Sequence, residues 1–225
     1  MPHQAGAKPR NDERIFLIAA ISLALVFGTG FCGLIIALNV HEKATDSSGA
    51  VSPMRFSPDQ PRQLVNFTLT DRTGRRVTRA DLQGKILVVD FLFTGCSLTC
   101  PVVNRCMAQI QALTRHQPDV RLVSLTVDPR DDTPAVLAQY GEQYGADTNR
   151  WLFLTGAKSE LYNLIGNSFL PQGPADPFNY MPGNFTHTER IAVVDASGRV
   201  RAYFDGLRED AAAAVVAEIA ELSKH

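Results

Sequence analysis

Two cysteines in the middle of the chain have the spacing of a reactive pair. Cys96 and Cys100 lie four residues apart, and Pro101 directly follows the second. Three interpretations stay open, because such thiols can exchange disulfides, bind a soft metal ion or simply pack. Pro101 indicates a helix start, since the missing proline N–H would have no intrahelical partner there. The positive end of that helix favours thiolate over thiol but does not decide between redox and metal chemistry.

The segments around the pair predict an α/β fold. KILVVDFLF (85–93) is an almost continuous apolar run, typical of a strand buried on both faces, and it ends just before Cys96. Ligands usually bind at the carboxyl ends of strands in open α/β sheets. We expect a mixed central sheet flanked by helices, in a thioredoxin-like arrangement with the cysteine pair at the tip of a buried strand. The other predicted strands are 65–70, 121–128, 151–156, 190–195 and 199–204, and the predicted helices are 101–116, one from Thr133, one ending near Gly166, and 209–223.

His187 is the candidate third member of the site. It stands immediately before the predicted strand 190–195, where an ordinary thioredoxin fold has a proline beside the redox pair. Here the nearest proline, Pro182, lies five residues earlier, so we expect His187 to pass beside the two sulfurs. The other histidines lie in the tails, beside an apolar segment or at a helix end, and we do not expect them to bind a metal: His3, His41, His116 and His225.

Two thiolates and one imidazole form a soft three-ligand site. Such ligands select copper(I), and imidazole also accepts copper(II), whereas zinc usually needs a fourth ligand. Cys106 is a poor fourth ligand, because six helical residues past Cys100 turn it roughly 240° away, and we expect it to be buried. We therefore predict copper on Cys96, Cys100 and His187.

The N-terminal region predicts a membrane anchor. Residues 15–40 carry no charged side chain and are long enough for the roughly 30 Å apolar core of a bilayer. Lysine and arginine are denser before this segment than after it, which favours a cytoplasmic N-terminus. We predict a cytoplasmic tail (1–14), an uncleaved anchor (15–40), a linker (41–63) and a thioredoxin-like domain (64–225). The location expected is the bacterial inner membrane, single-pass, with the C-terminal domain in the periplasm.

The composition narrows the class of function. The chain has 225 residues, 45% of them hydrophobic, and a net charge of -1, which fits one domain with accessory segments. No basic stripe marks a nucleic-acid partner, so we expect none. Cys32 lies within the apolar segment and is interpreted as a small filler residue.

Several separated motifs resemble the Sco/SenC family of membrane-anchored copper proteins, which are linked to assembly of the binuclear copper centre of cytochrome c oxidase. They are FLFTGCSLTCP (91–101) with Met107, TVDPRDDTP (126–134), WLFLTG (151–156), and His187 with Asp195 eight residues on. The resemblance covers about residues 64–222 and implies Cys96, Cys100 and His187 as copper ligands. It also brings Asp128 near the site, although a turn residue is an equal interpretation.

The chain departs from the family pattern beside two of the ligands. Ser97, Leu98 and Thr99 separate the cysteines where the family usually has Pro-Asp, and Thr186 precedes the histidine where an acidic residue is common. We expect a metallochaperone that delivers copper to the oxidase subunit with the binuclear centre, or to another acceptor, after a periplasmic thiol reductant has reduced the pair. Two alternatives stay open: a thiol–disulfide oxidoreductase in which Cys96 attacks and Cys100 resolves, and a copper or redox sensor.

Overall fold

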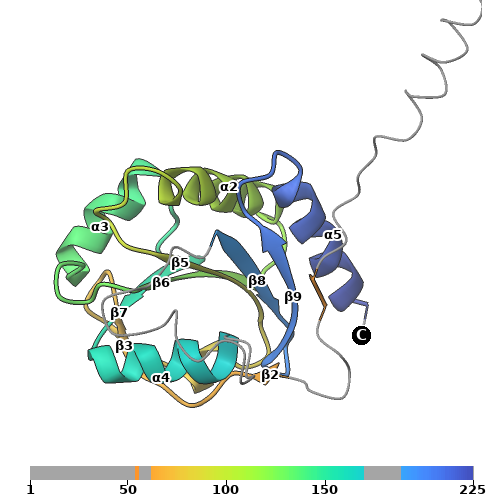
Figure 1. Cartoon of the computed structure of the whole chain (residues 1–225). Helices are drawn as coiled ribbons and strands as arrows, with labels where there is room; N and C mark the ends of the chain where they lie inside the picture. Colours follow the sequence, from red (N-terminus) through yellow and green to blue (C-terminus); the bar gives the residue numbers. More distant parts are fainter. Residues whose placement is uncertain (1–53, 56–61, 170–188, 225) are drawn as a thin grey trace, which may run out of the picture. The chain divides into compact units, whose positions relative to one another are not determined.

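The computed structural model describes residues 54–55, 62–169 and 189–224 (Figure 1). The predicted tail, the predicted anchor and His187 lie outside these residues. Within the described ranges, no helix has the length and apolar character needed to cross a bilayer. The predicted domain boundaries therefore stay a prediction.

One mixed sheet forms the centre of the described fold. Its strands lie side by side in the order β1-β9-β8-β5-β6-β7-β3-β4, and β2 also pairs with β9. The parallel strands are β5, β6 and β7, while β8, β9 and β3 join them antiparallel. The strand bounds are β1 (Met54–Arg55), β2 (Arg62–Gln63), β3 (Thr68–Asp71), β4 (Arg76–Thr78), β5 (Ile86–Leu92), β6 (Val120–Thr126), β7 (Trp151–Thr155), β8 (Arg190–Val194) and β9 (Arg199–Asp205).

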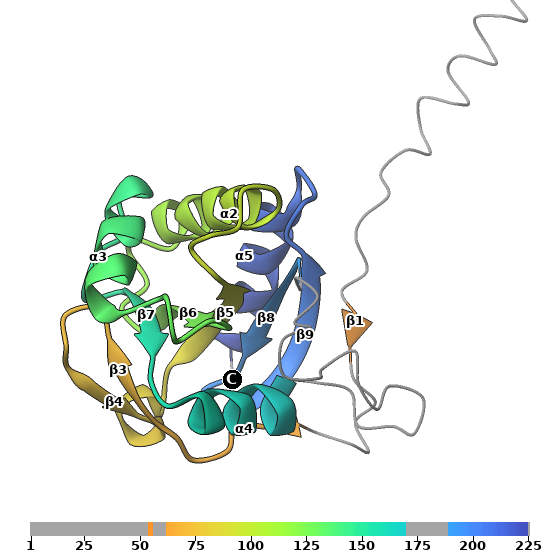
Figure 2. The same cartoon turned by 60° about the vertical axis from the view of Figure 1, so that its left-hand side comes forward.

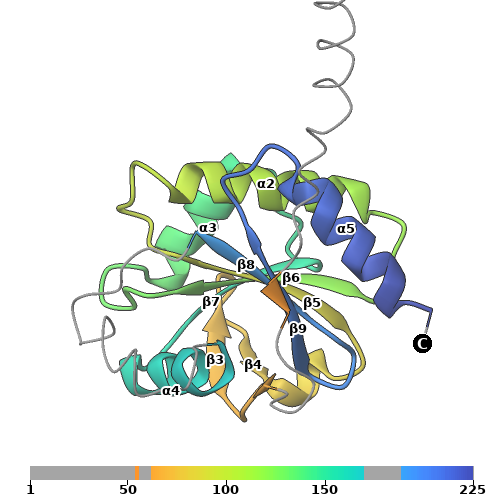
Figure 3. The ribbon, with the colours of Figure 1, turned by 45° about the vertical axis from the view of Figure 1, so that its right-hand side comes forward.

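Helices cover both faces of the sheet. In all three views α2, α3 and α5 lie on one face and α4 lies on the other (Figures 1, 2 and 3). The mixed sheet between helical layers confirms the predicted α/β class. The helix bounds are α2 (Cys100–Leu113), α3 (Pro134–Gln143), α4 (Lys158–Phe169) and α5 (Ala211–Leu222), with a short 3-10 helix η1 (Arg79–Leu82).

Strand β5 is buried along its whole length, as the apolar run predicted. Val88 and Leu92 face the cluster under α2, whereas Val89 and Phe91 face the cluster over α4. The alternation of a strand explains this division, because successive side chains point to opposite faces. Burial on both faces leaves β5 little freedom to shift, which fixes the position of its C-terminal end.

Two helix ends differ from the prediction. Helix α2 ends at Leu113 rather than near His116, because the following N–H groups donate to carbonyls three residues back, Arg115 to Ala112 at 3.4 Å and Gln117 to Thr114 at 2.9 Å, and so form turns. His116 therefore lies beyond the helix, where its Nε2 accepts a hydrogen bond from Arg115 at 3.0 Å.

Helix α4 continues past Gly166 to Phe169. The Phe169 ring is buried edge-on against Phe91 at a centroid distance of 5.3 Å. The Phe169 carbonyl also accepts a hydrogen bond from the Tyr203 hydroxyl at 2.6 Å. Burial of this last turn outweighs the usual tendency of glycine to end a helix.

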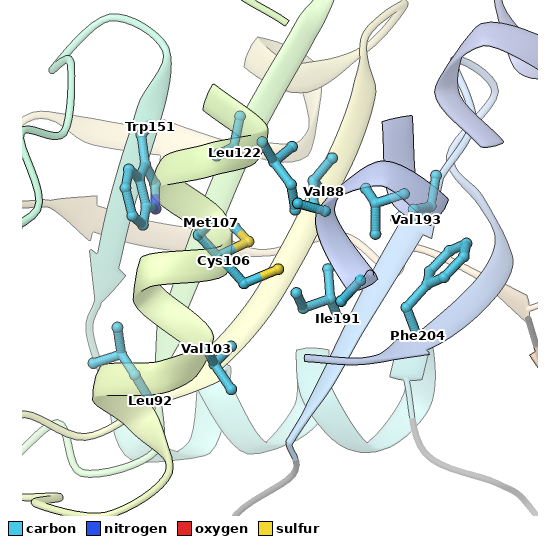
Figure 4. Close-up of a cluster of buried hydrophobic side chains, with 14 of the residues drawn as sticks. Val88, Leu92, Val103, Cys106, Met107, Leu122, Trp151, Ile191, Val193 and Phe204 are labelled. Carbon is cyan, nitrogen blue, oxygen red and sulfur yellow. The ribbon is translucent and has the colours of Figure 1, made fainter. Parts of the chain in front are cut away.

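The contact between α2 and the sheet forms the core beneath the cysteine pair. Figure 4 shows Cys106 and Met107 of α2 with Val88 and Ile191 of the sheet, and all four belong to one buried cluster. Cys106 is 7% exposed, so its predicted burial is confirmed.

Candidate functional site

The structure brings Cys96 and Cys100 together at the carboxyl end of β5. The chain leaves β5 at Leu92, carries Cys96 in the loop of residues 93–99, and enters α2 at Cys100 (Figure 2). The backbone N–H of Cys100 donates a hydrogen bond to Cys96 Sγ at 3.5 Å, and both residues are thiols rather than halves of a disulfide. The predicted position of the pair is therefore confirmed.

The environment lowers the pKa of Cys96. Burial alone would raise it, but hydrogen bonds from the N–H and thiol of Cys100 and from the N–H groups of Leu98 and Thr99 outweigh burial and lower the pKa from 9.0 to about 7. Thr99 Oγ1 lies 3.9 Å from the sulfur and supplies a further polar neighbour. Because these donors stabilise the thiolate, about half of Cys96 is ionised near neutral pH.

Cys100 is shifted in the opposite direction. Burial raises its pKa to about 12, and its hydrogen bond to Cys96 and the nearby carboxyl of Asp90 add to the rise, while the N–H of Phe93 opposes it. One sulfur is therefore poised as a thiolate, and the other keeps its proton until a metal ion or a disulfide replaces that proton.

Cys106 is a packed thiol rather than a member of the pair. Burial, with a smaller contribution from Asp90, raises its pKa to about 11. Among the described residues, no three histidine, cysteine or carboxylate side chains are grouped closely enough to hold a metal ion. The cysteine pair alone supplies two soft ligands.

Asp90 is a buried carboxyl in the middle of β5, on the face of the sheet that packs against α2. Its Oδ1 accepts a hydrogen bond from Ser124 Oγ at 2.5 Å, and Ser124 in turn accepts one from Trp151 Nε1 at 2.8 Å. Among the residues that the structure describes, Asp90 Oδ2 has no hydrogen-bond partner, and burial raises the pKa of this carboxyl to about 7. Asp90 has no part in the predicted site, although a charged residue inside an apolar strand is a usable signal.

The acidic loop 127–133 reaches the cysteine loop through Asp132, while Asp128 takes the turn position that was one of its two interpretations. Asp128 is a turn residue, since its carbonyl accepts the N–H groups of Asp131 and Asp132 at 3.2 and 2.9 Å. Asp132 is the buried one, and its Oδ1 accepts from the N–H and hydroxyl of Thr94 at 3.1 and 2.5 Å. Thr94 lies two residues before Cys96, so Asp132 is tied to the cysteine loop, whereas the N–H of Asp128 donates to Thr126 Oγ1 at 2.9 Å.

His187 lies outside the described residues, and its role as a ligand stays a prediction. The described strand that follows it, β8, runs antiparallel to β5, with Val89 opposite Ala192 and Leu87 opposite Val194. The chain therefore enters β8 at the edge of the sheet where β5 ends. This direction agrees with the topology on which the prediction for His187 rests.

Comparisons with known proteins agree on one family. The SCO1/SenC family model matches residues 57–224. A SCO1 protein homolog of Bacillus subtilis is 33% identical over 109 residues, which cover 48% of this chain and 56% of the relative, just over half its length.

Two solved structures share the fold. A SCO1/SenC family lipoprotein from Bacillus anthracis is 26% identical, with a TM-score of 0.63 over 77% of this chain and 98% of that one. ScoI of Bradyrhizobium japonicum with copper bound is 25% identical, with a TM-score of 0.56 over 70% of this chain and 98% of that one.

Proposed function

This chain belongs to the SCO1/SenC family, and on that premise we propose that it is a membrane-tethered copper carrier that serves assembly of the copper centre of cytochrome c oxidase. The observation that carries the proposal is the pair of soft ligands, Cys96 and Cys100, held together at the end of β5. Copper as the cargo is supported by the copper-bound ScoI of Bradyrhizobium japonicum, which shares this fold. Delivery to the oxidase is supported by the role of the family that the sequence motifs resemble.

The ligand set proposed for copper(I) is Cys96, Cys100 and His187. Two thiolates and a neutral imidazole suit a soft monovalent ion. Because Cys96 is about half ionised at neutral pH and Cys100 is protonated, binding should release about 1.5 protons per copper ion near pH 7. Proton release at this level distinguishes binding by both thiols from binding by Cys96 alone, which would release about 0.5.

Transfer would proceed by stepwise exchange of these ligands for those of an acceptor. The loop between the cysteines faces solvent, and Leu98 is 80% exposed. Ser97 is exposed as well, and neither residue carries a charge. An acceptor that approaches Cys96 through this loop would meet an apolar contact rather than the acidic one usual in the family, so we propose an acceptor surface with an apolar patch beside its copper ligands.

We also propose that the chain is tethered to the membrane and that its thioredoxin-like domain lies in the periplasm. The support is the uncharged segment 15–40 with its asymmetric flanking charges, and the lipoprotein nature of the Bacillus anthracis relative. Fractionation in carbonate should leave the chain in the membrane pellet, and a protease added outside spheroplasts should digest the domain. Recovery of the chain in the soluble fraction would contradict the tether.

One observation favours a second function, thiol–disulfide exchange. The low pKa of Cys96 beside the high pKa of Cys100 is the asymmetry that an attacking and a resolving thiol need. Cys96 thiolate would attack a client disulfide and release one client thiolate. Cys100 would then lose its proton and attack Cys96 Sγ, which frees the second client thiolate and leaves the pair oxidised. An upstream thiol reductant would have to restore the pair.

Copper transfer to the oxidase subunit domain separates the two functions. The reduced, copper-loaded chain is mixed with the metal-free acceptor domain, and copper on each protein is measured after separation. We expect copper to move to the acceptor, with transfer lost in Cys96→Ser and retained in the control Cys106→Ser, whose sulfur is packed in the core. Retention of copper by the chain, together with reduction of a disulfide in the acceptor, would support the oxidoreductase instead.

A further inference from the structure

Asp132 ties the cysteine loop to the rest of the sheet. The residue is 1% exposed, and its carboxylate is surrounded by donors. Oδ1 accepts from Thr94 N and Thr94 Oγ1 at 3.1 and 2.5 Å, while Oδ2 accepts from Thr126 Oγ1 and lies 3.3 Å from Thr94 N. Hydrogen bonds to a buried carboxylate are stronger than those between neutral groups, so the contacts of Asp132 with Thr94 and Thr126 form a clamp.

Asp132 is itself held in place from two directions. Its N–H donates to the carbonyl of Asp128 at 2.9 Å, which closes the turn after β6. The next residue, Thr133, is the N-cap of α3, and its hydroxyl accepts the N–H of Val136 at 3.4 Å. The position of the Asp132 carboxylate is therefore fixed by the end of β6 and the start of α3, and rigid elements of this kind hold a site precisely.

The clamp acts on the part of the loop that carries Cys96. The loop is also held at its end, where the N–H groups of Val102 and Val103 donate to the carbonyl of Thr99, the N-cap residue of α2. Between Thr94 and Thr99, the Cys96 N–H donates to the Phe93 carbonyl at 3.1 Å, and Cys96 Sγ accepts from the Cys100 N–H at 3.5 Å. Without the clamp at Thr94, the start of the loop would lose the side-chain hydrogen bonds that join it to the acidic loop 127–133.

We propose that Asp132 is a positioning residue for the thiol site, which holds the start of loop 93–99 so that Cys96 Sγ stays at the right distance from Cys100. The inference rests on the proposed function for its copper readout, but the geometry of the pair can also be measured without copper. The clamp couples the acidic loop to the cysteines through hydrogen bonds and not through metal ligation. Asp132 does not need to contact the copper ion for this role.

The test compares Asp132→Ala with Asp195→Ala in the full reduced chain. Asp195 is a matched control, because it accepts from Ser197 N, Ser197 Oγ and Arg199 N at 2.9, 2.6 and 3.0 Å in the turn after β8. That turn lies at the opposite end of the sheet, since Val194 is paired with Leu87 near the start of β5. Both variants lose a carboxylate with several donors, so both should lower the melting temperature.

Only the clamp variant should change the chemistry of the pair. Two quantities are measured well below the melting temperature: the copper(I) affinity by competition with a chelator, and the equilibrium of the pair with glutathione. In the second reaction the dithiol and one glutathione disulfide give the Cys96–Cys100 disulfide and two glutathione thiols. We expect Asp132→Ala to lower both constants about tenfold, which corresponds to about 1.4 kcal/mol, and Asp195→Ala to change neither by more than about twofold.

The outcomes separate the inference from the proposed function. Failure of the wild-type chain to bind copper would overturn the carrier, while a tenfold fall in the glutathione equilibrium for Asp132→Ala alone would still support the positioning role. Wild-type values of both constants in Asp132→Ala, or equal losses in Asp195→Ala, would overturn it. If Asp132→Ala does not fold, Thr94→Val removes the hydroxyl donor on the same clamp and should lower both constants in the same direction, and unchanged values would refute the inference.

Discussion

The opposite pKa shifts of the two cysteines predict a specific pattern of alkylation. At pH 7 a thiol with a pKa of about 7 is roughly half thiolate, whereas one with a pKa of about 12 is about one part in 10⁵ thiolate. The more acidic thiolate is also the weaker nucleophile, and this reduces the expected ratio of the two reaction rates on the order of 10²-fold. Cys96 should therefore react with iodoacetamide on the order of 10²–10³ times faster than Cys100.

The perturbation is Cys100→Ala, which removes the thiol donor to Cys96 but keeps the backbone donor. In the wild-type chain the labelling rate of Cys96 should rise with pH and level off above about 7. In the variant the midpoint should move upward but stay below the ordinary 9.0, because the N–H groups of residue 100, Leu98 and Thr99 still favour the thiolate. Labelled sites are identified by mass spectrometry after proteolysis across pH 5–10.

Cys106→Ser is the control for this series. Cys106 lies in the core, and its replacement should leave the Cys96 profile unchanged. A wild-type midpoint at or above 9, or equal labelling of Cys96 and Cys100 at pH 7, would refute the assignment of the two thiols.

Two further predictions concern a buried carboxyl and an exposed leucine. The Asp90 carboxyl has its pKa raised from 3.8 to about 7, so between these values the native state keeps a proton that the unfolded state loses, and the free energy of unfolding falls as pH rises. Asp90→Asn can still accept the hydrogen bond from Ser124 but should lack this pH dependence. Its free energy of unfolding, measured with urea, should exceed that of the wild type by up to about 4 kcal/mol at pH 8 and by little at pH 4. Parallel plots of unfolding free energy against pH for the two proteins would contradict the prediction. Leu98→Ser should slow copper transfer to the acceptor domain several-fold and leave copper affinity unchanged, because Leu98 is 80% exposed beside the sulfurs. The matched control Leu113→Ser, 56% exposed at the far end of α2, should transfer at the wild-type rate, and equal slowing in both would exclude a specific contact.

The position of the cysteine pair could be predicted because it depends on strong local signals. Every residue of β5 is buried, and an apolar run of that length has few alternatives to a central strand. Pro101 marks the first turn of α2 for the simple reason that it has no N–H to donate. The loop that joins β5 to α2, and Cys96 within it, must therefore lie at the carboxyl end of β5.

The role of Asp132 could not be predicted, because it depends on the path of a loop. Asp128, Asp131 and Asp132 lie within five residues, and nothing local indicates which of them turns inward. In the structure Asp131 pairs with Arg130 at the surface, whereas Asp132 is buried against Thr94. Which donor meets which carboxylate follows from the pairing of β5 with β6, a contact between segments far apart in the sequence.

The proposed copper site of Cys96, Cys100 and His187 is best tested by the copper affinity of the reduced chain with and without His187. Full-length protein in mild detergent is titrated with copper(I) against a chelator, beside His187→Ala and the control His116→Ala, whose ring lies in the turn after α2 and accepts a hydrogen bond from Arg115. We expect about one tightly held copper ion per chain, a loss of at least about tenfold in affinity for His187→Ala, and no change for His116→Ala. Little copper in any of the three, with all of them reducing a test disulfide, would contradict the carrier and leave a thiol–disulfide oxidoreductase.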